Sequence, residues 1–317
     1  MRPVTGFTLT ELLIAMLLGM ILMTLTLTAF SSLSRSARQT QQLAELQQNA
    51  QLAMSILQNE LANTGFWGGR SEPQLAVTLT LPNPPAGDCV EAALDSGSFP
   101  QPAQSFVTLY ARTIGAGRQL NCLTGAIPQT ELLQIKRLLG LQTAIADMRQ
   151  NRFYLESGWQ HSRFVDSNSA GLTAEYDYFP YQHLVFYLQQ QRLDGESIPV
   201  LMRKRLSRNQ AGQAVISTDS VLDGVERMHF EFGIDSDADG QLDYQLTTEQ
   251  MSAQLWQQSN ARIISLRYHL LLRARQSDPN YINQQRYDMG PHRFVAPGDH
   301  YRRLLVSSTI FFQNAVL

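Results

Sequence analysis

The chain is poor in charged residues, and lysine is the scarcest of them. Charged residues make up 16% of its 317 residues, well below the usual quarter. Lysine occurs twice, as Lys136 and Lys204, so arginine carries almost all of the positive charge. The formal net charge of −2 gives no general attraction to polyanions. We therefore expect no nucleic-acid partner.

Sequence signatures of catalysis are also missing. The chain has no Gly-x-Ser-x-Gly elbow and no phosphate-binding loop. Its six histidines show neither His-Glu-x-x-His nor His-x-His spacing, and its two cysteines do not form a Cys-x-x-Cys pair. The sequence therefore favours neither an enzyme nor a catalytic metal.

What the chain does have is a long apolar run close to its first residue. The run extends from Phe7 to Phe30 and contains a single charged residue, Glu11. At about 1.5 Å per helical residue it is long enough to cross a bilayer core of about 30 Å. A short leader, residues 1–6, precedes the run and ends in Gly6. An ordinary secretory signal is cut after its apolar segment, whereas a cut after Gly6 leaves the membrane helix in the mature protein.

The segment Gly6-Phe7-Thr8-Leu9-Thr10-Glu11 resembles the class III prepilin signal. The resemblance implies that a prepilin peptidase cleaves between Gly6 and Phe7 and methylates the new terminal amine. It also implies that Glu11 meets the terminal amine of a neighbouring subunit during filament assembly. Thr10 departs from the pattern, in which Ile is commoner. The alternative for Glu11 is a carboxylate that snorkels into lipid headgroups.

The apolar helix is expected to continue beyond the membrane through residues 31–64. Apolar residues recur there at steps of three and four, which predicts a stripe that packs on a sheet: Leu43, Leu46, Ala50, Met54, Leu57 and Leu61. Gly65, Gly68 and Gly69 are expected to end the helix. The alternative is a membrane anchor joined by a flexible linker to a separate globular domain.

Residues 65–317 are predicted to form a β-rich head. Residues 73–104 are rich in Pro, Gly and Ala and are expected to be irregular. Strands are predicted at 106–110, 132–135, 183–189, 198–202, 225–234, 263–271 and 304–312, with an Asp-Gly turn at Asp194-Gly195. Strands that follow a long helix without regular helix–strand alternation predict an α+β fold, with the helix packed on an antiparallel sheet.

Both cysteines, Cys89 and Cys122, lie beyond the membrane segment. Arg2 before the segment fits a cytoplasmic N-terminus and a periplasmic head. In that oxidising compartment an even pair of cysteines predicts a disulfide. Two unpaired buried thiols are the alternative.

The nine residues 235–243 carry the sharpest site signal. Asp235, Asp237, Asp239 and Asp243 flank Gly240, with a spacing that matches the first half of an EF-hand calcium loop. The Gln241 carbonyl is a further candidate ligand, but Leu246 replaces the usual bidentate Glu. We therefore expect a Ca²⁺-binding loop between strands. An acidic turn held by Asx hydrogen bonds is the alternative.

A basic run, Arg203-Lys204-Arg205, follows one of the predicted strands. Contact with DNA or lipid headgroups is one interpretation of such a run. We favour a solvated strand edge, which discourages pairing with other chains.

Several stretches resemble the PilW family of minor type IV pilins, namely Glu60–Gly68, Gly224–Asp243, Ile263–Arg273 and Tyr301–Asn314. The resemblance implies a non-catalytic subunit of a tip complex that primes pilus assembly and supports adhesion or twitching motility. Its implied partners are other minor pilins, the major pilin, a PilY-type tip adhesin and the inner-membrane assembly platform. The first alternative is the J-type pseudopilin of type II secretion, which is usually shorter. A membrane-anchored periplasmic binding module or enzyme is a more remote one.

Overall fold

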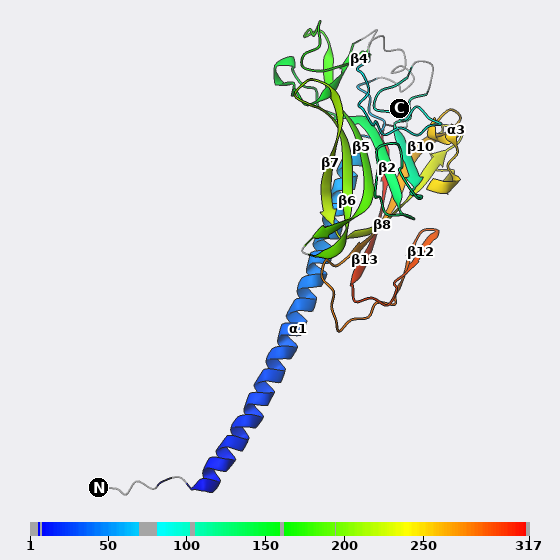
Figure 1. Cartoon of the computed structure of the whole chain (residues 1–317). Coiled ribbons are helices and arrows are strands. Elements are labelled where there is room, and N and C mark those ends of the chain that lie inside the picture. Colours follow the sequence, from blue (N-terminus) through cyan, green and yellow to red (C-terminus); the bar gives the residue numbers. More distant parts are fainter. Residues whose placement is uncertain are drawn as a thin grey trace.

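The computed structural model describes residues 6, 8–69, 81–101, 105–158, 162–193 and 195–314. One long helix, α1 (Leu9–Leu61), carries a β-rich head at its C-terminal end, and the N-terminal half of the helix projects away from the head (Figure 1). Thr8 caps the helix in a capping box with Glu11. After the helix the chain turns at Gly65, Gly68 and Gly69, all of which have positive φ angles.

The larger sheet of the head has seven antiparallel strands. Their order is β1-β2-β5-β3-β4, and β6 pairs with β5 and with β7. The long strand β5 organises this sheet, because its first part pairs with β2 and β3 while its second part pairs with β6. The strands are β1 (Leu109–Thr113), β2 (Glu131–Leu138), β3 (Phe153–Ser157), β4 (Ser162–Val165), β5 (Asp177–Leu193), β6 (Glu196–Arg208) and β7 (Ala214–Asp223).

A second sheet has four antiparallel strands in the order β13-β10-β8-β9, and a separate hairpin pairs β11 with β12. The hairpin lies at the end of the head from which α1 emerges (Figure 1). The elements are β8 (Val225–Asp235), β9 (Tyr244–Thr247), β10 (Arg262–Arg273), β11 (Arg286–Met289), β12 (His292–Val295) and β13 (Arg303–Phe311), with short helices η1 (Ile145–Asp147), η2 (Thr248–Gln250) and α3 (Ala253–Trp256).

The main core lies where the second half of α1 meets the two sheets. Helix residues Leu46, Ala50, Ala53, Leu57 and Leu61 are buried, and α1 contacts β7, β10 and β13. Their spacing of three and four residues places them on one face of the helix, as the apolar stripe predicts. Leu43 and Met54 of that predicted stripe lie at its margins, since Leu43 is exposed and Met54 is half-buried. Burial of this face fixes the helix to the head.

The α+β fold with a long helix on antiparallel sheets is confirmed, but several details differ from the prediction. The strands divide into two sheets and a hairpin, and the sequence did not predict β3, β4, β7, β9, β11 or β12. The expectation that the basic run lies on a sheet edge is wrong, because β6 pairs on both sides. Within the described stretch 81–101 there is neither helix nor strand. The remainder of the predicted irregular region includes residues 73–80 and 102–104, and these, like Asp194, lie outside the described residues.

Candidate assembly helix and cation-binding loop

The N-terminal half of α1 is an apolar surface without a partner in the described part of the chain. Its apolar stretch has no buried residue, and the helix is long and apolar enough to cross a membrane. Its hydroxyl groups do not oppose insertion, because they bond to the helix backbone: Thr24 Oγ1 donates to Met20 O at 2.7 Å and Thr26 Oγ1 to Met23 O at 2.9 Å. The segment therefore suits either lipid or the apolar interior of a helical filament.

The acid of this segment, Glu11, lies in the first turn of α1. One of its carboxylate oxygens accepts the backbone N–H of Thr8 at 2.9 Å and the Thr8 hydroxyl at 2.8 Å. Glu11 N in turn donates to Thr8 Oγ1 at 3.3 Å. Gly6 is exposed, and Phe7 lies outside the described residues. The prepilin resemblance assigns the Glu11 carboxylate to subunit docking. In the single chain this carboxylate is instead hydrogen-bonded to Thr8, the N-cap of its own helix.

Charged groups attach the other half of α1 to the larger sheet. Glu60 pairs with Arg137 of β2, and its other oxygen lies 3.6 Å from Arg203 of β6. Arg203 also lies 3.3 Å from Asp219 of β7. Part of the basic run is thus engaged by acidic residues of the helix and the adjacent strand. Burial lowers the pKa of Arg137, although the Glu60 carboxylate opposes that effect.

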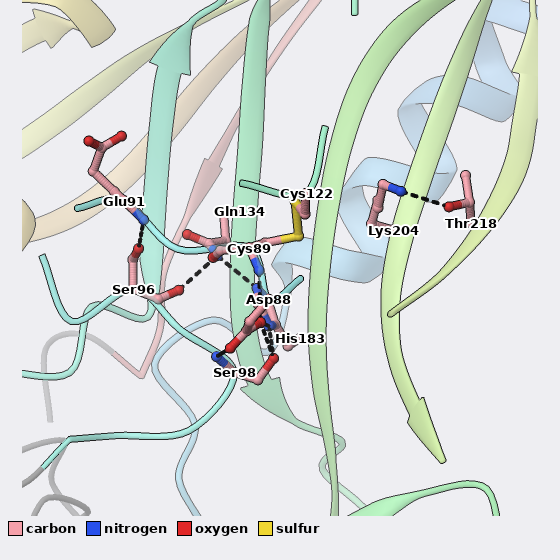
Figure 2. Close-up of a disulfide and its surroundings, with 10 residues drawn as sticks. All are labelled: Asp88, Cys89, Glu91, Ser96, Ser98, Cys122, Gln134, His183, Lys204 and Thr218. Carbon is pink, nitrogen blue, oxygen red and sulfur yellow. Dashed lines mark hydrogen bonds and ion pairs between the residues drawn. A yellow bond between two sulfur atoms is a disulfide. The ribbon is translucent and has the colours of Figure 1, made fainter. Parts of the chain in front are cut away.

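The predicted disulfide between Cys89 and Cys122 is present. Figure 2 shows it beside a buried polar network around Gln134 and His183. Gln134 Nε2 lies 2.8 Å from Cys89 O and 2.7 Å from His183 Nε2. The other nitrogen of His183 lies 2.9 Å from the Ser98 hydroxyl, which donates to Asp88 at 2.6 Å. Because the Ser98 hydroxyl donates to Asp88, its oxygen is free to accept the Nδ1–H of a neutral His183 imidazole. Burial and the ammonium of Lys136 lower the pKa of His183 well below its usual range.

The acidic loop connects β8 to β9, so it lies between two strands of one hairpin. Asp235, Asp237 and Asp239 each place one carboxylate oxygen within 4.8 Å of the others. The backbone makes this possible by turning at Ala238 and Gly240, whose φ angles are 63° and 82°. Asp237 and Asp239 are exposed, whereas Asp235 is buried. Three predicted ligands therefore converge.

The other two predicted ligands of the loop have different neighbours. The Asp243 carboxylate accepts the backbone N–H of Ser236 at 2.7 Å and also the Ser236 hydroxyl. These bonds lower the pKa of Asp243. The Gln241 side chain donates to Asp239 at 3.0 Å, and its backbone N–H donates to the same carboxylate at 2.7 Å. Asp243 thus closes the base of the loop, and Gln241 orients Asp239.

One oxygen of Asp235 provides a test of whether the loop suits a cation. Asp235 Oδ2 accepts the Gly240 N–H at 2.9 Å. Asp235 Oδ1 is buried and has no hydrogen-bond partner among the described residues. A buried carboxylate oxygen without a partner is costly, and a hard cation on the loop would satisfy it. The residues present therefore fit Ca²⁺, whose preferred ligands are oxygens.

A second cluster, formed by Glu131, His229 and His292, is not predicted by any pattern in the sequence. Its members are 98 and 63 positions apart in the chain, so no local spacing connects them. A carboxylate at the start of an apolar strand is the one feature of the sequence that indicates a site, and it does not show which residues lie near it.

A methylation-type N-terminus, a long helix and an antiparallel head together define a type IV pilin-like protein. Residues 1–27 match the family model of the prokaryotic N-terminal methylation motif, and residues 185–314 match that of the type IV pilus-assembly protein W, PilW. The chain thus carries a PilW-type region behind a prepilin signal, and the two matches support a minor pilin related to the type IV pilus. No curated protein and no solved structure gives a significant match. The PilW match begins within β5 and includes the whole second sheet and the acidic loop.

Proposed function

We propose that this chain is a non-catalytic minor pilin of the tip complex that primes type IV pilus assembly and supports adhesion or twitching motility. The observation that carries the proposal is the unbroken helix α1, which is apolar and exposed in its first half and packed on the head in its second. Such a helix needs an apolar environment at one end and holds a folded head at the other. A subunit that moves from membrane to filament meets both requirements.

In this proposal residues 1–6 are a leader and residues 7–30 span the inner membrane, with the N-terminus in the cytoplasm. Residues 31–64 and the head, 65–317, then lie in the periplasm. The prepilin peptidase cuts between Gly6 and Phe7 and methylates Phe7, and Glu11 docks onto the terminal amine of a neighbour. Partners are other minor pilins, the major pilin, the inner-membrane assembly platform and a PilY-type adhesin. Support comes from the match of residues 1–27 to the methylation motif.

We also propose that the acidic loop binds one Ca²⁺ through Asp235, Asp237 and Asp239. The unpartnered Oδ1 of Asp235 supports this assignment. The Gln241 carbonyl and Asp243 are further ligand candidates, with Asp243 acting directly or through water. The ion would join the ends of β8 and β9 and neutralise carboxylates that otherwise repel one another. Its role is therefore structural.

Mass spectrometry of the mature protein tests the processing step. We expect a chain that begins with N-methylated Phe7, because glycine at position 6 lets the peptidase approach the backbone closely. Gly6→Val should leave the leader attached, whereas Gly19→Ala, within the apolar segment, should be processed normally. An intact Met1 in the wild-type protein, or a cut beyond Phe30, would contradict the pilin assignment.

The cellular role is tested by deleting the gene and counting surface pili. Loss of pili that is restored by the wild-type gene is the expected result. Normal piliation together with a defect in protein secretion would instead assign the chain to a secretion pseudopilus.

A further inference from the structure

We propose that Glu131, His229 and His292 form a binding site for a divalent transition-metal ion, with zinc as its probe. Glu131 is the first residue of β2, His229 lies within β8, and His292 is the first residue of β12. The three residues therefore come from the larger sheet, the second sheet and the hairpin. An ion bound by all three would join three parts of the head.

The distances between the three side chains fit a metal centre. Glu131 Oε1 lies 3.0 Å from His229 Nδ1 and 3.3 Å from His292 Nε2. One ligand atom from each residue lies within 4.8 Å of the others. In a tetrahedral site with bonds of about 2.0–2.2 Å, ligand atoms are about 3.3–3.6 Å apart. The ligand atoms are therefore close to the spacing of a metal site.

A nitrogen of each ring lies beside the carboxylate, and one ring must turn before both lone pairs face one ion, because a metal lies in the plane of each imidazole that binds it. The two imidazoles are stacked, with centroids 4.1 Å apart and an interplanar angle of 17°, so that a nitrogen of each lies beside the same carboxylate oxygen. His292 Nε2 is buried and has no hydrogen-bond partner in the part of the chain that the structure describes. It lies 3.3 Å from Glu131 Oε1, and with Nε2 deprotonated it would be a candidate ligand atom.

Hydrogen bonds to Oε2 fix the orientation of the Glu131 carboxylate. Glu131 is fully buried, and its Oε2 accepts the Phe230 N–H at 2.9 Å and the Thr248 hydroxyl. These bonds fix the carboxylate with Oε1 facing the rings, as the hydrogen-bonding partners of metal ligands commonly do. A fully buried carboxylate also needs a positive charge close by, and a metal ion would supply it.

The hairpin that carries His292 is held in place by contacts outside the cluster. Gly290 has a φ of 63°, and a Cβ at that position would lie 3.0 Å from the Glu231 carboxyl group, so the turn packs closely on β8. Phe294 of β12 lies under the guanidinium groups of Arg227 and Arg303, with ring-centre distances of 4.9 and 5.5 Å. The hairpin that carries His292 is thus positioned before any ion binds, which lowers the cost of binding.

The donor set distinguishes this site from the acidic loop. Two imidazoles and one carboxylate suit zinc and its neighbours in the first transition series, whereas calcium prefers oxygen ligands only. The His292 side chain is 23% exposed while that of Glu131 is fully buried, so an ion would enter past His292. Positions not filled by the three residues would be open to water.

Isothermal titration calorimetry of the full-length mature chain in detergent tests the site, with calcium present to saturate the acidic loop. We expect one zinc ion per chain. His292→Ala should weaken zinc binding by at least about tenfold. His300→Ala is the matched control and should bind as the wild type does, because His300 lies outside the cluster with Nδ1 2.7 Å from Tyr281 O. Asp237→Ala with Asp239→Ala should also retain zinc binding.

X-ray absorption at the zinc edge of the wild-type chain gives a test that does not depend on any variant folding. Two imidazole nitrogens and an oxygen ligand at about 2.0–2.2 Å are expected. The proposal is overturned if the wild-type chain binds no zinc, if the edge spectrum shows oxygen ligands alone, or if a folded His292→Ala variant binds zinc as tightly as the wild type. None of these results would alter the pilin assignment, which depends on N-terminal processing and on pili.

Discussion

At the scale of single residues, the attachment of helix to head depends on a few charged side chains. The Arg137 side chain is 4% exposed and its carboxylate partner is Glu60 of α1. Arg137 Nη1 also donates to Asn59 O at 3.2 Å. Neutralising one partner of a buried ion pair lowers the stability of the protein by more than the intact pair adds to it, because the other charge then stays buried without a partner.

We therefore predict that Glu60→Gln destabilises the head on its helix. The free energy of unfolding, measured by denaturant titration of the full chain in detergent, should fall by about 2–4 kcal/mol. Glu45→Gln removes the same charge from an exposed position of α1 and should change stability by less than about 0.5 kcal/mol. Equal effects of the two substitutions would show that the Glu60 contacts add no stability.

His183 gives a prediction of pH dependence. It is buried among Asp88, Ser98 and Gln134, and its pKa is well below 6.5. The unfolded chain therefore takes up a proton on this ring as the pH falls below about 6.5, while the folded chain does not. Stability should fall with pH in that window, by up to about 1.4 kcal/mol per pH unit from this group.

Replacing the ring by a neutral amide isolates this contribution. His183→Gln should flatten the dependence of unfolding free energy on pH below about 6.5, measured against the wild type in the same buffers. His300→Gln, at an exposed position, should keep the wild-type slope. An unchanged slope in His183→Gln would assign the acid sensitivity to other groups.

At the scale of elements, local patterns determine how much the sequence predicts. The apolar run and stripe predict a helix over residues 7–64, and α1 extends from Leu9 to Leu61. Strands with clear apolar patterns, such as β8 and β10, were predicted to within about two residues at each end. β7 was missed because much of it is polar and half-exposed, and β11 and β12 have four residues each.

Candidate sites are likewise predictable only where a local sequence pattern contains their residues. The acidic loop is contiguous, so its spacing alone indicates a cation. The sequence did not indicate that Asp243 bonds to Ser236, because that depends on how the loop closes. The Glu131, His229 and His292 cluster is assembled by contacts between sheets, which no local pattern encodes.

The loop between β8 and β9 carries a prediction about calcium. Calcium that binds only the folded state at 100 times its Kd should add about 2.7 kcal/mol of stability. The melting temperature of the full chain in detergent should therefore be higher in calcium than in EDTA. Asp237→Ala with Asp239→Ala should remove most of the difference.

The control removes two exposed carboxylates elsewhere, through Asp147→Ala with Asp177→Ala. It should retain the calcium effect. If the wild type melts at the same temperature in calcium and in EDTA, and calorimetry detects no calcium binding, the segment is an acidic turn.

At the scale of the whole molecule, the head and the second half of α1 pack together, whereas the first half of α1 packs against no other described part of the chain. The head and the second half of α1 share one core, while the first half exposes apolar side chains from Leu9 to Leu33. Within that exposed half Glu11 is the one carboxylate, and it is costly in a membrane.

Glu11→Ala should therefore separate insertion from assembly. Membrane insertion should be unchanged or improved, because a buried acid is removed. Pili counted by electron microscopy, in a strain whose only copy carries the substitution, should be fewer, because the neighbouring amine loses its partner. Glu45→Ala removes a carboxylate from the other half of α1 and should leave pili at wild-type numbers. Wild-type piliation in Glu11→Ala would mean that the charge is dispensable in this subunit.

The unbroken course of α1 also has a mechanical consequence. Its 53 residues form a lever about 80 Å long, with the head clamped to the far end by a buried face and by Glu60. A tilt of about 5° at the base would carry the head sideways by about 7 Å. Small differences in how the base is seated are thus amplified into different positions of the head and its two candidate cation sites.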